Sequence, residues 1–400
     1  MRRRTLLTTA LAAPLAACSP QRAADPAASS SLPTPARPTT TATPTSAAPT
    51  PSDDTRAVDA ALDRLSVPQL AGQCLAIGVV PADSPGHIAS LVSGLGLGGV
   101  FLLGHWTDAA QVRAMTAAVH RAATGGIHPF IASDHEGGQV QNVRVPQVGR
   151  LPSQAEMGSW DTSRVESVVG RSARGLHTLG LSMAYSPVAD VVDPTLGRQN
   201  GPVGAHDRGF GTDPATCGRH AAAVVRAHRR AGLVSTVKHF PGLGRIRSNT
   251  DFSSQGTTDT TTGVDDAFLD SFAQALAAGC EAVMVSSATY ARIDPDHPAV
   301  FSRRVVTDLL RTRMGHHGLV VSDDLGAAAA VASVPAEQRA RRFVAAGGDQ
   351  AITADPHLAR AMVSGLVDLA GSGPSGLETV RRAAGHVVSV KSDHDLVTSA

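Results

Sequence analysis

Lysine is almost missing from this sequence. Among its 35 lysine and arginine residues only Lys238 and Lys391 are lysines, so arginine is the ordinary cation of the chain. Aromatic residues make up only 3% of the sequence, and the formal net charge is +1. A balanced charge provides no basic field for nucleic acid, so we expect no partner of that class. Each lysine, being an exception, needs a specific reason.

Cysteine is also scarce, and long apolar runs are absent beyond the first residues. The sequence has four cysteines, and the three that follow Cys18, namely Cys74, Cys217 and Cys280, are odd in number and lack metal-ligand spacing. We therefore expect buried free thiols, with neither a disulfide framework nor a metal site. No second apolar stretch is long enough to span a bilayer.

The first 18 residues have the pattern of an export signal. Three arginines lead a short apolar run that ends at Cys18. The run is too short for a membrane span, but it suits a signal peptide. Leu15–Cys18 resembles a bacterial lipobox, in which the cysteine is lipidated, and Arg3-Arg4 with the following Thr-Leu-Leu resembles a twin-arginine signal. An ordinary secretory leader with an incidental cysteine is the alternative. We expect a lipoprotein anchored at the outer face of the cytoplasmic membrane.

Residues 19–55 are rich in Pro, Ala, Ser and Thr and predict a disordered linker. Residues 56–400 then alternate apolar runs with helical patterns. The runs are continuous, as in parallel strands that are covered on both faces. They comprise residues 74–80, 98–104, 128–134, 182–191, 234–240, 281–288, 318–324 and 349–355. Eight strand–helix units predict a single catalytic domain with the α/β architecture of a (β/α)₈ TIM-like barrel. A doubly wound open sheet is the alternative, but no glycine-rich phosphate motif follows the first strand.

Polar residues collect at the carboxyl ends of the predicted strands. These residues are Asp134, Asp190, Lys238, His239, Ser286, Ser287, Asp323, Asp324 and Asp355. The carboxyl ends of the strands form the active face of a barrel, whereas a merely structural charge pattern would not favour one end. The pattern therefore predicts an active site at this face.

Four motifs follow one another in the order found in family 3 glycoside hydrolases. They are SDHEGGQVQ after the third strand, GFGTDP at Gly209–Pro214, KHFPGLG at Lys238–Gly244 and VVSDDLG at Val320–Gly326. From Asp59 onward the chain resembles the single-domain branch that removes terminal β-linked N-acetylglucosamine. The pairing of KHFPG with a later SDD is highly specific. The resemblance implies a retaining glycosidase that needs no metal or organic cofactor.

The resemblance also assigns roles to single residues. Asp323 corresponds to the family's nucleophile, whereas the adjacent Asp324 points to the other side of the strand and is expected to have a structural role, as a cap or in an ion pair. A helix cap formed by both aspartates is the structural alternative. Lys238 and His239 correspond to a pair that holds sugar hydroxyls, and arginine would be too long and forked for that contact. Asp134 and Arg208 likewise correspond to sugar-binding residues; for Arg208 a loop ion pair is the alternative.

The sequence departs from the family pattern where the acid/base is expected. Relatives supply an Asp-Ser-His triplet on a mobile loop, but this chain has Asn249-Thr250-Asp251, and Leu243 replaces another histidine. Either Asp251 is itself the general acid, which requires partial burial to raise its pKa, or the acid is lost or moved, for example to His206. We favour Asp251. Gln139 and Asn142 stand where relatives carry arginines, and Arg144 is out of register.

The sequence therefore predicts a lipoprotein enzyme that hydrolyses terminal β-N-acetylglucosaminides by retention. Fragments of peptidoglycan, muropeptides that contain N-acetylglucosamine, are the expected substrate because an envelope-anchored enzyme meets them there. A muropeptide-binding or sensing lipoprotein with a degenerate site is the alternative of a different class, and a β-glucosidase of the same family is the nearer one. His220, His228, His316 and His317 are expected at the surface.

Overall fold

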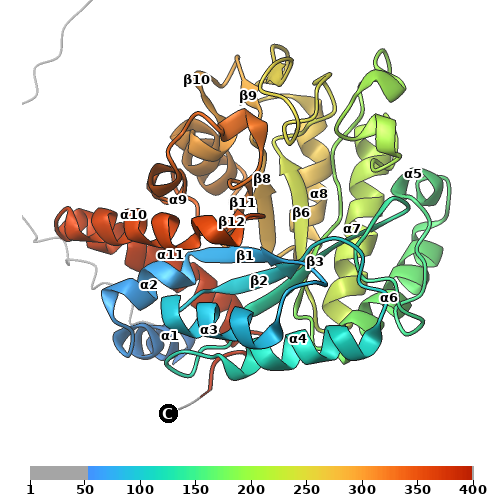
Figure 1. Ribbon diagram of the computed structural model, residues 1–400. Helices are drawn as coiled ribbons and strands as arrows, with labels where there is room; N and C mark the ends of the chain where they lie inside the picture. Colours follow the sequence, from blue (N-terminus) through green and yellow to red (C-terminus); the bar gives the residue numbers. More distant parts are fainter. Residues whose placement is uncertain (1–52, 399–400) are drawn as a thin grey trace, which may run out of the picture. The chain divides into compact units, whose positions relative to one another are not determined.

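The structure, a computed structural model, describes residues 53–398, so the predicted signal peptide with Cys18 and nearly all of the predicted linker lie outside the described residues. Eight parallel strands close into a barrel (Figure 1). Strand β2 pairs with both β1 and β3, which completes the ring. The strands are β1 (Leu75–Val79), β2 (Gly99–Leu102), β3 (Phe130–Gly137), β5 (Met183–Tyr185), β6 (Val234–Phe240), β8 (Ala282–Val285), β11 (Leu319–Asp324) and β12 (Gln350–Thr353). The predicted (β/α)₈ barrel is confirmed, and the open sheet is excluded.

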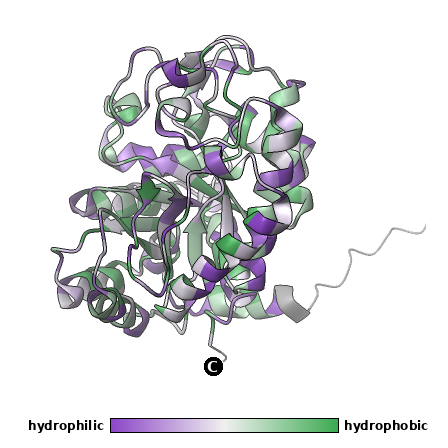
Figure 2. Cartoon of the chain, turned by 90° about the vertical axis from the view of Figure 1, so that its right-hand side faces the viewer, coloured by the Kyte–Doolittle hydropathy of each residue, from purple (hydrophilic) through white to green (hydrophobic). Residues whose placement is uncertain are grey.

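A helical segment follows each barrel strand and packs on its outer side. These segments are α3 (Pro85–Leu95), α4 (Ala109–Arg121), α6 (Thr162–Thr178), α7 (Pro214–Arg230), α8 (Asp270–Ala277), the π-helical η5 (Arg304–Arg313), α9 (Ala336–Ala345) and α10 (Ala359–Gly371). Local signals explain their starts: Asp213 caps α7 by accepting the Thr216 amide at 2.8 Å, and Pro214 occupies the first turn. Figure 2 shows hydrophilic and hydrophobic turns mixed on the outer helices, as expected for helices with one buried face.

Further elements complete the domain. The helices α1 (Asp53–Asp63) and α2 (Val67–Gln73) both pack on α11 (Pro374–Ser392), and α5 (Gln154–Met157) is a short helix after β3. Strand β4 (Val140–Gln141) pairs antiparallel with β3. The strands β7 (Thr258–Asp259), β9 (Thr289–Tyr290) and β10 (Asp294–Pro298) form a separate small sheet. Six short helical turns of the described residues lie in loops or at helix starts. They are η1 (Gly197–Gln199), η2 (Gly204–His206), η3 (Ala267–Leu269), η4 (Ala299–Phe301), η6 (Ala329–Val331) and η7 (Pro356–Leu358), and η2 and η6 bear on the site.

Two apolar clusters lie on the two sides of the barrel wall. The inner cluster takes residues from every barrel strand, namely Ala76, Phe101, Phe130, Ala132, Met183, Tyr185, Val234, Ala282, Met284, Leu319, Val321 and Ile352. Val387 and Val390 of α11 join it. The outer cluster takes the alternate strand residues, such as Ile77 and Val320, together with the helices. The continuous apolar runs in the sequence therefore reflect burial on both faces.

Three of the four histidines expected at the surface are in fact buried. His220 is 5% exposed, His228 is fully buried and His316 is 5% exposed; only His317 is exposed. The prediction failed because these side chains find hydrogen-bond partners inside the fold: His228 Nδ1 lies 3.0 Å from Ser235 Oγ, and His316 Nε2 lies 3.1 Å from a carbonyl.

The cysteines behave as predicted. Cys74, Cys217 and Cys280 are free and buried. Within residues 53–398, no helix has the length and hydropathy that a membrane span requires.

Candidate active site

Side-chain alternation along the strands selects which polar residues face the barrel interior. Ala132 on β3 and Val321 on β11 belong to the inner cluster. Asp134 lies two residues further along β3, and residues two apart on a strand point to the same face. The register of β11 shifts between Val321 and Asp324, and the place of Asp323 follows instead from its electrostatic interactions with Asp251 and His239. Both carboxylates therefore lie on the inner side, at the carboxyl ends of their strands. Those ends carry the reactive groups of barrel enzymes.

Lys238, at the end of β6, lies between two carboxylates. Its Nζ is 2.6 Å from Asp134 Oδ1 and 2.6 Å from Glu136 Oε1. Burial lowers the pKa of this lysine, but Asp134 and Glu136 outweigh burial, and the pKa of Lys238 is raised. A compact ammonium fits between two neighbouring carboxylates, whereas a guanidinium requires a planar, forked arrangement. This contact gives the reason for a lysine in a chain that otherwise uses arginine.

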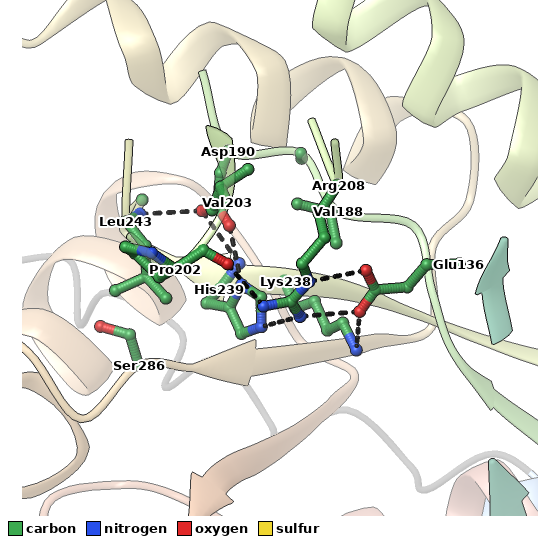
Figure 3. A network of polar contacts seen from close by, with 12 residues as sticks. Glu136, Val188, Asp190, Pro202, Val203, Arg208, Lys238, His239, Leu243 and Ser286 are labelled. Atoms are coloured by element: carbon green, nitrogen blue, oxygen red, sulfur yellow. Dashed lines mark hydrogen bonds and ion pairs between the residues drawn. The ribbon is translucent and has the colours of Figure 1, made fainter. Parts of the chain in front are cut away.

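Glu136 is a site residue that the sequence analysis missed. Its carboxylate accepts two hydrogen bonds from Arg208, at 2.8 Å from Nε and 2.7 Å from Nη2, in addition to the contact with Lys238 (Figure 3). Burial raises the pKa of Glu136, but the charges of Arg208 and Lys238 dominate and hold it at about 2. Glu136 is thus a permanent buried anion that joins two cations. The sequence did contain a signal for Glu136: it lies two residues after Asp134 on the same strand, and residues two apart point to the same face.

His239 is fixed in one tautomer by its two neighbours. Its Nδ1 is 2.7 Å from Asp190 Oδ2, and its Nε2 is 3.1 Å from Arg208 Nη2. A guanidinium only donates, so Nε2 accepts and the ring proton lies on Nδ1, where it is donated to Asp190. Asp190 also accepts the main-chain amides of His239 at 3.1 Å and Leu243 at 2.9 Å. One buried aspartate therefore holds both the imidazole and the turn that follows β6.

The four residues predicted to bind sugar come together but differ in accessibility. Side-chain exposure is 24% for Asp134, 14% for Arg208, 6% for His239 and 2% for Lys238. Asp134 and Arg208 therefore present the most surface to a ligand. Lys238 and His239 act mainly by holding these neighbours in place. The loop ion pair considered for Arg208 exists, but its partner is the buried Glu136 of the site itself.

Asp323 and Asp324 have the different surroundings that their opposite directions predict. Burial first, and then the charge of Asp251, raise the pKa of Asp323 to about 6. Asp324 accepts the amides of Gly326 at 2.8 Å, Ala327 at 2.9 Å and Ala354 at 2.8 Å. Asp324 is thus a capping residue of the turn after β11. Asp323 carries one hydrogen bond in that turn, from the Asp324 amide at 2.9 Å.

Asp251 lies on the loop after β6, which we call the flap (residues 245–257). Asn249 organises its tip, because Oδ1 accepts the Asp251 amide at 2.9 Å and the main-chain carbonyl accepts the Phe252 amide at 3.2 Å. Although residue 251 is exposed as a whole, burial raises the pKa of its carboxyl; Arg208 opposes the shift, and Asp324 adds to it. The carboxyl of Asp251 therefore belongs electrostatically to the group around Asp323.

The other positions where the sequence departs from the family pattern also have definite places. Leu243 is buried in the outer apolar cluster. Asn142 donates from Nδ2 to the Leu102 carbonyl at 2.9 Å, and Arg144 donates from Nε to the Gln141 carbonyl at 2.7 Å. Gln139 is exposed, and His206 is half-buried in η2. Asn142 thus ties the segment after β4 to the end of β2, and Arg144 holds a main-chain group of β4.

The model of the glycosyl hydrolase family 3 N-terminal domain matches residues 66–390, which is most of the chain. The chain belongs to glycosyl hydrolase family 3. It is therefore a glycoside hydrolase.

Individual relatives of this family 3 enzyme agree with that assignment. A β-hexosaminidase of Xanthomonas oryzae pv. oryzae is 30% identical over 256 residues, which is 62% of this chain and 73% of that protein. A β-N-acetylglucosaminidase/β-glucosidase of Cellulomonas fimi is 34% identical over 279 residues, 67% of this chain but only 47% of that protein. The crystal structure of a β-N-acetylhexosaminidase from Beutenbergia cavernae is similar with a TM-score of 0.77 at 36% identity, covering 82% of this chain and 99% of that one.

Replacing Glu136 by glutamine should weaken both the fold and sugar binding of this glycoside hydrolase. The change leaves Arg208 and Lys238 without the buried anion that joins them, and breaking a buried ion pair typically costs about 3–5 kcal/mol. We expect a lower free energy of unfolding in urea and a raised KM. Glu156→Gln, an exposed glutamate on α5, is the matched control and should change neither. Wild-type stability of the Glu136 variant would contradict its role as a joining anion.

Proposed function

We propose that this enzyme removes terminal, non-reducing β-linked N-acetylglucosamine by a two-step retaining mechanism. One observation carries the proposal: Asp323, at the inner end of β11, has its pKa raised to about 6 by burial and by the carboxylate of Asp251 on the flap. Retaining glycosidases use two such groups on opposite sides of the scissile bond. The β-hexosaminidase relatives support the choice of sugar.

In the first step, Asp323 attacks the anomeric carbon. A carboxylate oxygen forms a bond to C1 while the bond from C1 to the leaving oxygen breaks, and Asp251 transfers its proton to that oxygen. The burial that raises the pKa of Asp251 favours the protonated form required at this point. The products of the step are the free leaving alcohol and a covalent glycosyl ester on Asp323.

In the second step, water replaces the enzyme on the sugar. Asp251, now ionised, takes a proton from the water. The oxygen of that water attacks C1, and the ester bond between C1 and Asp323 breaks. The sugar is released with its original anomeric configuration, and both aspartates return to their starting states. The loss of negative charge on Asp323 during the ester stage also removes its repulsion of the Asp251 carboxylate.

The residues around the two carboxylates have complementary roles in this proposal. Asp134 and Arg208, the most exposed members, bind hydroxyl groups of the sugar ring. Lys238 and His239 set their positions through the contacts to Asp134 and Arg208. These groups restrict the orientation of C1 toward Asp323, and such restriction is a large contribution to catalysis.

We infer that peptidoglycan fragments with a terminal N-acetylglucosamine are the biological substrate. The inference rests on the proposed export signal, which would bring the enzyme to the cell envelope. A β-glucosidase activity is the second candidate, and the dual name of the Cellulomonas fimi relative favours testing it. A binding or sensing role without catalysis is the third, which the pairing of Asp251 with Asp323 disfavours because binding alone has no need of a nucleophile.

Chromogenic substrates separate these candidates. Purified enzyme should release p-nitrophenol from the β-N-acetylglucosaminide much faster than from the β-glucoside, and NMR should detect the β-anomer of the sugar as the first product. A soluble disaccharide of N-acetylglucosamine and N-acetylmuramic acid then tests the substrate class. Initial formation of the α-anomer would refute retention. Binding of the disaccharide without any turnover would support the sensing role.

We also propose that Cys18 is lipidated and anchors the enzyme to the membrane from outside. The lipobox-like Leu15–Cys18 and the preceding arginines support this placement. Replacing Cys18 by serine should move the enzyme activity from the membrane fraction into the soluble fraction of the producing cells, with unchanged specific activity. Equal membrane association of the variant and the wild type would contradict the anchor.

A further inference from the structure

The flap that carries Asp251 is held by main-chain hydrogen bonds to η6. The Ala329 amide donates to the Asp251 carbonyl at 3.2 Å, and the Ala330 amide donates to the Thr250 carbonyl at 3.1 Å. The Thr250 side of the turn is also packed, because this residue is 1% exposed. The place of Asp251 above the barrel thus depends on η6, which belongs to the loop between β11 and α9.

A single arginine organises that loop. Arg339 extends from α9 and is 8% exposed. Its guanidinium donates to four main-chain carbonyls, those of Leu325 (2.6 Å), Gly326 (2.8 Å), Ala332 (3.2 Å) and Val334 (2.7 Å). Two of these carbonyls precede η6 and two follow it. The guanidinium of Arg339 therefore binds the main chain on both sides of η6, the segment that contacts the flap.

The nucleophile has a separate support. Asp324 accepts the amides of Gly326 and Ala327, on the β11 side of the loop, and the amide of Ala354 next to β12. These bonds hold the end of β11, and with it Asp323, in addition to the contacts that Arg339 makes with the Leu325 and Gly326 carbonyls. Loss of the arginine should therefore disturb η6 and the flap while the strand end stays in place.

We propose that Arg339 is a positioning residue for the general acid. It sets the position of η6, and η6 sets the position of the Asp251 main chain. The planar guanidinium has five donors in a fixed geometry and can serve four carbonyls at once, which the three donors of a lysine ammonium cannot reproduce. The inference rests on the proposed role of Asp251 as the acid.

The dependence of rate on the leaving group tests the proposal. A good leaving group such as 2,4-dinitrophenolate needs no proton, whereas phenolate or a sugar alkoxide does. In Arg339→Lys we expect kcat/KM to fall about 10-fold or more with phenyl β-N-acetylglucosaminide, and by less than about threefold with the dinitrophenyl substrate. Arg342→Lys is the matched control: it lies exposed on the same helix and should change neither rate.

A second variant acts on the flap contact without touching the arginine. Ala329→Pro removes the amide that donates to Asp251; Ala329 begins η6, and the extended Ala328 before it (ψ 125°) suits a following proline. It should show the same selective loss.

The outcomes distinguish failure of the proposed role of Arg339 from failure of the proposed role of Asp251. Equal losses with both substrates in both variants, or no loss in either, would overturn the role of Arg339. If Asp251→Ala itself lacks selectivity for the leaving group, the proposed acid is wrong and this inference falls with it. If Asp251→Ala is selective and the two loop variants are not, only the inference on Arg339 falls.

Discussion

Asp323→Asn should lower kcat for p-nitrophenyl β-N-acetylglucosaminide by a factor on the order of 10⁴ or more. The amide cannot form the covalent glycosyl ester, and loss of an enzyme nucleophile removes most of the catalytic gain. The expected result holds for every leaving group, because the attacking oxygen is needed whether or not the leaving group requires a proton. Asp368→Asn, an exposed aspartate on α10, is the control and should keep wild-type activity.

The same variant should be more stable than the wild type at neutral pH, which distinguishes loss of chemistry from loss of fold. Burial and the charge of Asp251 raise the pKa of Asp323 to about 6, whereas its ordinary value is 3.8. The folded state therefore binds the proton more tightly than the unfolded state, so the stability of the wild type falls as pH rises from about 4 to about 6 and stays at the lower level above pH 6. The gain for asparagine should be on the order of 1–3 kcal/mol at pH 7 and should vanish below about pH 4.

Two results would contradict the assignment of Asp323. One is activity of the asparagine variant within about tenfold of the wild type, because a residue whose loss lowers the rate so little does not form the covalent intermediate. The other is failure of a 5-fluoro analogue of the substrate, which keeps the 2-acetamido group and has a good leaving group, to label the wild-type protein on Asp323, as read by peptide mass spectrometry.

Asp251→Ala should lower kcat/KM by about 10²–10⁴-fold for substrates with poor leaving groups and far less for the dinitrophenyl glycoside. Added azide should accelerate turnover of the dinitrophenyl substrate and give the β-glycosyl azide, because azide attacks the glycosyl ester without a general base. Ser254→Ala, a neighbouring exposed flap residue, should behave as the wild type. A uniform loss with no azide product would show that Asp251 is not the acid/base.

The pH profile provides a second readout for the same residue. The charge of Asp251 helps to raise the pKa of Asp323, so its removal should lower that pKa. In Asp251→Ala the acidic limb of kcat/KM, measured with the dinitrophenyl substrate, should therefore move to lower pH. Since the two carboxyls titrate together, the limb reports on the pair in the wild type and on Asp323 alone in the variant. An unmoved limb would mean that the two groups do not interact.

The sequence predicted the barrel because its signals were local. The strand runs are buried on both faces, and the polar residues follow the runs at one end, as in β6 with Lys238 and His239. Asp323 and Asp324 could also be told apart, since alternation along a strand assigns one to each face. Those predictions need only the period of a strand and the rule that barrel enzymes use its carboxyl end.

What the sequence did not reveal depends on contacts between distant segments. Arg208 and Glu136 are 72 residues apart, and no local pattern indicates that they pair. The main-chain hydrogen bonds from η6 to the flap join residues about 80 positions apart. Such pairings form only when the barrel closes. The spacing of two residues between Asp134 and Glu136 was visible in the sequence, but its meaning became clear only when the structure placed both carboxylates beside Lys238.

The two amide contacts that dock the flap on η6 also bear on how substrate enters. Each main-chain hydrogen bond contributes about 0.5–1.5 kcal/mol net, so lifting the turn away costs roughly 1–3 kcal/mol. Molecules with a raised turn would then form a minority of roughly one in six to one in a hundred and fifty. A glycan that requires the raised form for entry is captured from that minority, and its apparent affinity is reduced by the same fraction.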